Sequence, residues 1–116
     1  GRITWLYCQI AMAKQDLQLY EARARIMKAL AHPTRLFVVD RLAEGEHCVN
    51  ELTSMVGCDM STMSKHLAIL KNAGVIADEK RGACIYYTLR FTCVTRFFTC
   101  TDNVLKTTAK ERLVLA

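Results

Sequence analysis

The sequence predicts a mainly α-helical domain of the α+β class that carries one small β-hairpin. Two short segments, 51–56 and 59–75, show apolar residues at helical spacing and are separated by only a tight turn. Two runs of strand character, 75–80 and 83–89, follow directly. A helix-turn-helix followed by a hairpin is a winged helix-turn-helix, and we expect about five helices in all.

The segment 59–75 predicts a helix suited to a DNA groove. Asp59 is a good N-cap, Gly74 provides the left-handed residue at the end, and Asn50 is expected to cap the helix before it. Apolar residues at helical spacing would face a core: Met63, Leu67 and Leu70. Hydroxyl and basic groups on the other side can reach phosphates and base edges: Ser61, Thr62, Ser64, Lys65 and His66.

An ordinary helical hairpin would show the same two helices, so the hairpin that follows decides between the two interpretations. We expect its turn at Arg81-Gly82, which places Lys80 and Arg81 at the tip, where cations can touch the phosphate backbone. The net charge of +5 and the pI near 9.0 favour a polyanionic partner. The sequence therefore predicts binding to double-stranded DNA.

The length of 116 residues fits one domain, which we place at 15–110 with a short C-terminal tail at 111–116. Residues 1–14 are interpreted as an N-terminal extension, foreign to the domain or disordered, because Met12 resembles a natural translation start. The extension lacks the layout of a signal peptide. No apolar run approaches the length of a membrane span. We therefore expect a soluble, cytoplasmic protein with no membrane partner.

Helical patterns are also expected at 17–30, from Pro33 to about Gly45, and at 93–106 with Thr92 as the cap. The last of these helices has an apolar stripe without an obvious partner in so small a core: Val94, Phe97, Phe98, Thr101 and Leu105. First and last helices of winged domains commonly pair across a two-fold axis. The sequence thus predicts a homodimer that reads two half-sites about one DNA turn apart.

Three runs resemble the ArsR family of metal- and metalloid-responsive winged-helix repressors: ALAHPTRLFVVDRLAEGEHCVNEL, STMSKHLAILKNAGVI and KRGACIYYTL. The resemblance covers about 26–105. It implies a homodimeric repressor that sits on operator DNA and leaves it when an inducer binds, with no obligatory cofactor and no small-molecule substrate. The last helix lacks the ligands of zinc-sensing relatives, since Cys93 and Val104 stand where two of them are expected.

Six cysteines in a chain without export features indicate metal or redox chemistry before structural disulfides. Cys93 and Cys100 lie seven positions apart, on one face of the last helix. Helix rise separates their α-carbons by about 10 Å, whereas two sulfurs on one ion lie within about 4.6 Å. A shared ion requires that the helix start unwinds, or that another segment or protomer supplies a cysteine. The helix N-terminus and Arg90 beside it favour the thiolate of Cys93.

The other cysteines carry weaker signals. Cys48 lies in a predicted short strand at 47–49, where arsenic- and cadmium-sensing relatives carry a Cys-Val-Cys pair, but Asn50 replaces the second cysteine. Cys48 alone cannot supply the three sulfurs that soft ions prefer, so a ligand and a core filler both stay open. We interpret Cys58 and Cys84 as structural. Cys8 lies in the N-terminal extension, from which some relatives donate a cysteine across the dimer.

Two functions of the same DNA-binding class follow. In the first, the operator is released when As(III), or Sb(III), Cd(II) or Pb(II), binds Cys93, Cys100 and Cys48. In the second, the same thiols are oxidised to a disulfide or polysulfide bridge. A thiol enzyme is disfavoured, since the chain has no Cys-x-x-Cys motif and no histidine or asparagine placed to activate a nucleophile.

Overall fold

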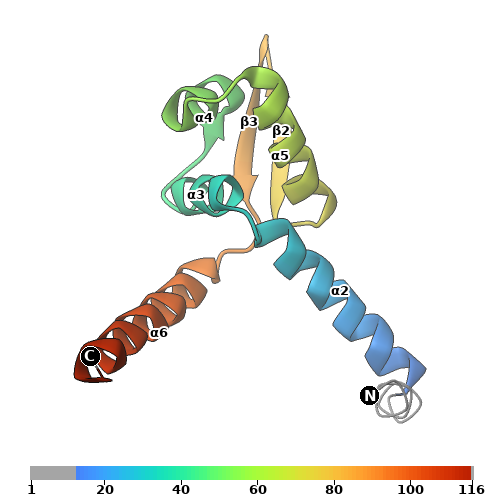
Figure 1. Cartoon of the computed structure of the whole chain (residues 1–116). Coiled ribbons are helices and arrows are strands. Elements are labelled where there is room, and N and C mark those ends of the chain that lie inside the picture. The colour runs from blue at the N-terminus through green and yellow to red at the C-terminus, as the bar shows by residue number, and fades with distance from the viewer. Residues whose placement is uncertain (1–12, 116) are drawn as a thin grey trace.

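The computed structural model describes residues 13–115, which contain five helices and three strands. In chain order these are α2 (Lys14–Leu30), α3 (Pro33–Leu42), β1 (His47–Cys48), α4 (Val49–Val56), α5 (Met60–Asn72), β2 (Ile76–Arg81), β3 (Cys84–Leu89) and α6 (Val94–Leu115). Helices α3, α4 and α5 surround the sheet, while α2 and α6 extend from this body in diverging directions (Figure 1). The predicted winged helix-turn-helix is confirmed.

The three strands form one antiparallel sheet in the order β1-β3-β2. The hairpin pairs Ile76 with Leu89 at its base and Arg81 with Cys84 at its tip. Its turn is therefore Gly82-Ala83, one residue later than predicted, because Gly82 supplies the positive φ of 61°. The predicted short strand is β1, whose two residues pair with the middle of β3.

One hydrophobic core lies between α3, α4, α5 and the sheet. Its most deeply buried side chains are Val38, Val39, Leu52, Met63, Leu67, Leu70, Val75, Ile76 and Val94. The buried residues of α5 are the three apolar positions that the sequence predicts, so packing fixes which face of this helix points outward. Among the described residues, no helix is long and apolar enough to cross a membrane.

Two helix boundaries differ from the prediction. Helix α4 begins at Val49 with Cys48 as its N-cap, and the carboxylate of Glu51 accepts the backbone N–H of Cys48 at 3.3 Å. The prediction that Asn50 caps this helix is therefore wrong, because Glu51 forms a capping box with a residue that is not a usual cap. Thr92 lies in the turn before α6, so it is not the cap of that helix either.

Helix α6 runs to Leu115, beyond the end expected at about Lys106 and through the segment assigned to a tail. The sequence after Lys106 contains neither glycine nor proline, so nothing local ends the helix there. Most of the predicted N-terminal extension, including Cys8, lies outside the described residues. Helix α2 already begins at Lys14, three residues before the first expected helical position.

Candidate DNA interface and thiol residues

Helix α5 is fixed by its cap and by its buried face. The carboxylate of Asp59 accepts the backbone N–H of Thr62 at 2.6 Å, and this hydrogen bond is the main reason that the pKa of Asp59 lies below its ordinary value. Gly57 ends the preceding helix in a left-handed conformation and turns the chain toward Asp59. The two helices thus form the helix-turn-helix that the sequence predicts.

The outer side of α5 presents small polar and basic groups. Four of the five predicted DNA-binding residues of this helix are exposed: Ser61, Thr62, Ser64 and Lys65. Lys65 takes part in no ion pair within residues 13–115. Hydroxyl and ammonium groups on a protruding helix are suited to phosphate and base-edge contacts. Their contacts with DNA stay predictions.

His66, the fifth predicted DNA-binding residue of α5, is only half-exposed and faces the body of the domain. Its Nδ1 accepts a hydrogen bond from Nη1 of Arg35 at 3.1 Å, and its ring centroid lies 4.5 Å from that of His32. Burial, then the neighbouring His32 and Arg35, lower the pKa of His66. Its Nδ1 is therefore occupied within the protein, and a role at DNA stays a prediction.

The contacts of Arg35 were not expected from the sequence. Its Nε also donates to the backbone carbonyl of Ala29 at 2.6 Å, so one guanidinium joins the end of α2 to α5. His32 caps α3 by accepting the backbone N–H of Thr34 at 3.1 Å. The only local signal for this cluster is the run His32 to Arg35 itself, which is part of the family motif.

The two basic residues predicted at the wing tip differ in their surroundings. Lys80 is exposed and takes part in no ion pair among the described residues. The guanidinium of Arg81 donates to both carboxylate oxygens of Glu46, at 2.7 and 2.9 Å, and to Glu79 at 3.0 Å. It also lies 4.8 Å from the ring centroid of Tyr86. These hydrogen bonds raise the pKa of Arg81 and lower that of Glu46, so two carboxylates already balance this cation.

The described cysteines fall into two groups by exposure. Cys48 is buried as the N-cap of α4, while Cys58 and Cys84 are half-buried. Cys93 and Cys100 are exposed. Cys93 lies in the turn just before α6, and Cys100 lies two turns into the helix. Among the cysteines that the structure describes, this pair is the most accessible to an ion or an oxidant.

The two exposed thiols share one face of α6 with apolar residues. Phe97 lies between the two cysteines and Val104 lies one turn beyond Cys100, all at spacings of three or four residues. Phe97 is 38% exposed and Val104 is 64% exposed. Val94 and Phe98 turn instead toward the core, where Val94 is fully buried. Cys93 and Cys100 therefore belong to an apolar stripe that one chain leaves uncovered.

No preformed metal site exists in a single chain within residues 13–115. No three histidine, cysteine, aspartate or glutamate side chains of this region are grouped as ligands of one ion. The predicted ligands Cys48, Cys93 and Cys100 are therefore not brought together in this arrangement. A site that uses them needs movement or a second protomer.

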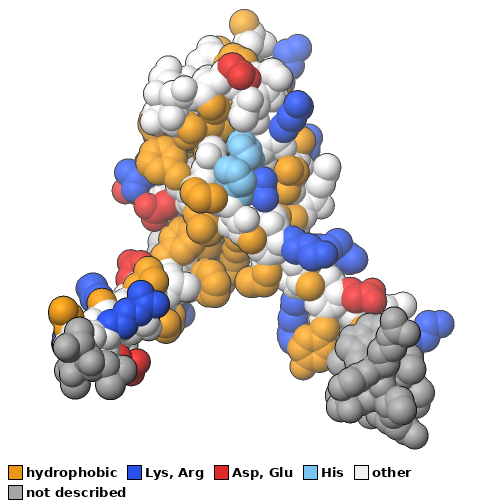
Figure 2. Space-filling view, viewed as in Figure 1, with side chains coloured by type: hydrophobic (Ala, Val, Ile, Leu, Met, Phe, Trp, Pro, Cys, Tyr) orange, Lys and Arg blue, Asp and Glu red, His pale blue; other side chains and the backbone are white. Residues whose placement is uncertain are grey.

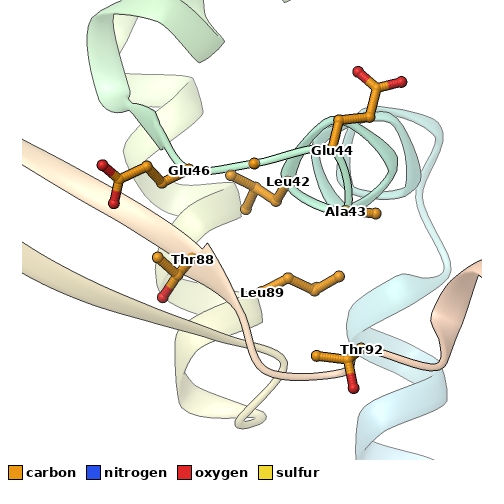
Figure 3. A pocket seen from close by; sticks show the side chains of 8 residues that line it. Leu42, Ala43, Glu44, Glu46, Thr88, Leu89 and Thr92 are labelled. Atoms are coloured by element: carbon orange, nitrogen blue, oxygen red, sulfur yellow. The ribbon is translucent and has the colours of Figure 1, made fainter.

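A hollow of about 300 Å³ lies beside the turn that precedes α6. Leu42 and Leu89 face this hollow, Thr92 lies at its edge, and the carboxylates of Glu44 and Glu46 point away from it (Figure 3). The lining mixes apolar side chains with two threonines and two glutamates. The hollow leaves space next to the turn that holds Cys93.

A capped helix that projects small polar groups, followed by a hairpin with the exposed Lys80 near its tip, is the arrangement of a winged-helix DNA-binding domain. The profile of the bacterial regulatory protein arsR family matches residues 32–78. Rv0081 of Mycobacterium tuberculosis, an uncharacterized HTH-type transcriptional regulator, is 31% identical over 98 residues, which cover 84% of this chain and 86% of that protein. The chain therefore belongs to the arsR family.

Solved structures agree with this assignment. The crystal structure of Rv0081 matches with a TM-score of 0.71 over 82% of this chain and 96% of that one, at 31% identity. A homodimeric winged helix-turn-helix DNA-binding domain from Mycobacterium bovis, solved by NMR, matches with a TM-score of 0.73 over 87% and 94%, at 29% identity. These relatives are transcriptional regulators, not enzymes, which confirms the class predicted from the sequence.

A repressor is also among the relatives. The biofilm growth-associated repressor of Xylella fastidiosa is 36% identical over 79 residues, which cover 67% of this chain and 69% of that protein. The shared region includes the helix-turn-helix matched by the family profile. The family resemblance inferred from the sequence motifs is confirmed.

Proposed function

We propose that this protein is a homodimeric transcriptional repressor that leaves its operator when a thiophilic ion, arsenite first among them, binds Cys93 and Cys100. Antimonite, Cd(II) and Pb(II) share the preference for sulfur ligands. The observation that carries the proposal is the exposure of this pair on one face of α6, while the other described cysteines are buried or half-buried. Cys48 is the least accessible of the three predicted ligands.

Homodimer formation is supported by apolar side chains that a single chain leaves exposed on two helices. On α2 these include Tyr20 and Met27, at 54% and 44% exposure, and on α6 they include Val104 and Leu105, at 64% and 67%. Hydrophobic side chains also line the region between α2 and α6 in the space-filling view (Figure 2). The M. bovis relative is described as homodimeric. Pairing of first and last helices across a two-fold axis would cover these residues.

The thiols need rearrangement or a second chain to share one ion. Seven residues at helical rise would separate the two α-carbons by about 10 Å, and Cys93 and Cys100 belong to no ligand group within residues 13–115, so the two sulfurs must be drawn together to share one ion. Cys93 precedes the helix, in a turn closed by hydrogen bonds from Val94 N to Phe91 O and from Arg96 N to Cys93 O, each 3.1 Å. Hydrogen bonds between residues three apart, as in a 3₁₀-helix, have poorer geometry than those of an α-helix. The hollow beside Thr92 also leaves space for this turn to move.

In the proposed dimer, ion binding would be coupled to DNA release. Because Cys93 and Cys100 lie on the stripe proposed to meet the second protomer, an ion that draws them together shifts α6 at the dimer interface. That shift changes the spacing of the two α5 helices on DNA. A hundredfold loss of operator affinity corresponds to about 2.7 kcal/mol of coupling free energy between the two sites.

Oxidation of the same two exposed thiols is the alternative. A disulfide would form with loss of two electrons and two protons to an oxidant, but it needs α-carbons within about 7 Å. An intact turn and helix hold Cys93 and Cys100 farther apart, which favours ion binding or a longer polysulfide bridge over a direct disulfide.

The proposal is tested by fluorescence anisotropy on an operator that the protein selects from random duplex DNA. The reduced protein on this DNA is titrated with arsenite, antimonite, Cd(II), Zn(II) and polysulfide, and its intact mass is read in parallel. We expect release by arsenite together with a mass gain of one arsenic per site. Release by polysulfide alone, with a mass change of added sulfur, would establish the oxidative alternative. Binding unaffected by all five reagents would overturn both.

A further inference from the structure

We infer that the polar face of α2 is a second phosphate-binding surface, in which Arg25 and Lys28 contact the DNA backbone beside the groove that α5 enters. This inference rests on the DNA-binding function of the fold and is independent of the inducer. It adds a DNA contact outside the helix-turn-helix and the wing, on a helix that the sequence predicts only as part of the dimer interface.

The two basic residues belong to a continuous polar face of α2. Residues at alternating spacings of four and three lie on one side of a helix, and on α2 this side carries Lys14, Gln18, Glu21, Arg25 and Lys28. The opposite side packs on the core through Leu30, while the buried Ala29 lies one turn after Arg25, where α2 meets α5. The exposed Tyr20 and Met27 lie to one flank of the polar face. Arg25 and Lys28 are therefore separate from the apolar side chains expected at the dimer interface.

This face continues the outer surface of α5. Arg25 and Lys28 line a shallow hollow of about 290 Å³ together with Ile69 and Asn72 of α5. Lys65 lies one turn before Ile69 on the same side of that helix. In the space-filling view, Lys and Arg side chains follow one another from the wing along the α5 side to the upper end of α2 (Figure 2). The basic surface thus extends past the recognition helix.

The charges of Arg25 and Lys28 are available to a partner. Both side chains are exposed, and neither takes part in an ion pair within residues 13–115. Lys71, the other cation near this end of α5, is instead bound to Asp78 at 2.9 Å. The carboxylate nearest on the polar face, that of Glu21, lies one turn farther from α5. Glu21 precedes Arg25 by four positions, but no ion pair joins them, so the two cations side by side are expected to attract a phosphate backbone.

The dimensions of DNA place phosphates at this position. Helix α5 contains 13 residues and is therefore about 20 Å long, whereas the major groove is about 12 Å wide. When the first turns of α5 contact base edges, its last turns project over the flanking phosphates. Arg25 and Lys28 lie beside Ile69 and Asn72, in those last turns.

The test measures the salt dependence of binding to a mixed-sequence DNA duplex, which needs no knowledge of the operator. The double variant Arg25→Gln/Lys28→Gln is compared with Lys106→Gln/Lys110→Gln, which removes the same charge from exposed positions on α6. The slope of log K against log salt is negative, and each lost phosphate contact reduces its magnitude by about 0.9, so a dimer that loses four contacts should have a slope less steep by about 3.6. We expect this loss for the α2 variant and none for the α6 variant.

Two results would overturn the inference, and they have different meanings. An α2 variant with the same slope as the α6 variant, beside a wild type that binds DNA, would exclude only the second surface. A wild type without salt-dependent DNA binding would exclude the DNA-binding function as well. Circular dichroism melts of both variants should match the wild type, since the substituted side chains are exposed and glutamine is a good helix former.

Discussion

Arg35 donates a hydrogen bond from Nη1 to Nδ1 of His66 across 3.1 Å, joining two residues that are 31 positions apart. The same guanidinium donates from Nε to the carbonyl of Ala29, at the end of α2. Arginine has no acceptor, so this contact requires that Nδ1 of His66 is unprotonated. The recognition helix is therefore tied to the helix proposed to form the dimer through a histidine that must stay neutral.

The first prediction concerns this histidine and pH. The pKa of His66 is lowered in the fold from its ordinary value of 6.5, chiefly by burial, so the unfolded chain binds more protons between the two pKa values. Its contribution to stability is complete above about pH 6.5 and is lost as pH falls toward the lowered pKa. We expect the free energy of unfolding, measured in urea, to decrease as pH falls below 6.5.

The variant His66→Gln provides the control, because its amide oxygen can accept the Arg35 hydrogen bond and does not titrate. Its unfolding free energy should change less than that of the wild type as pH falls below 6.5. Equal pH dependence in both proteins would show that His66 does not carry the effect.

The second prediction concerns the cap of α5. Asp59→Ala removes the acceptor for the N–H of Thr62, so the start of the recognition helix should fray and operator affinity should fall. Asp59→Asn should keep both the helix and the affinity, because asparagine is an equally good N-cap. Amide hydrogen exchange at Ser61 and Thr62 measures the fraying. Protection that survives in the alanine variant would exclude a role for the cap.

The third prediction separates the two basic residues of the wing. Lys80→Gln should reduce the magnitude of the negative slope of log K against log salt by about 0.9 for each protomer, since Lys80 carries a free charge at the tip. Arg81→Gln should lower it less, because Glu46 and Glu79 already balance the guanidinium. A larger loss for Arg81 than for Lys80 would mean that Arg81 leaves these carboxylates on DNA.

The fourth prediction concerns the packing of α5. Leu67 is 1% exposed, and Leu67→Ala should lower the free energy of unfolding by about 2 to 5 kcal/mol through lost burial and a residual cavity. Ile69 lies on the same helix at 43% exposure, so Ile69→Ala should cost much less. Urea unfolding of both variants at one pH measures the difference. Similar losses would mean that the buried face of α5 is misassigned.

The local parts of this fold could be predicted from the sequence because their signals are local. Asp59 caps α5, and Met63, Leu67 and Leu70 form its buried face, as their spacing indicates. Cys48 was not recognised as the cap of α4, since cysteine is not a usual N-cap and the signal came from Glu51 three residues later.

The sequence could not show which predicted site residues are already hydrogen-bonded within the protein, because these bonds are tertiary contacts. His66 and Arg81 both look like free groups at the DNA surface, yet Arg35 and Glu46, each more than 30 residues away along the chain, already bind them. Cys93 lies outside α6 only because the helix begins at Val94, one residue later than predicted. Such boundaries are the least certain part of any pattern-based assignment.

The measurement that tests the central claim most directly is arsenite titration of the protein on its operator, for the wild type and the double variant Cys93→Ser/Cys100→Ser. Cys84→Ser serves as the matched control, since this thiol is half-buried on the wing. We expect arsenite to release the wild type and the control, and the double variant to bind DNA normally and stay bound. A double variant that arsenite still releases would contradict the assignment of these two cysteines as the inducer site.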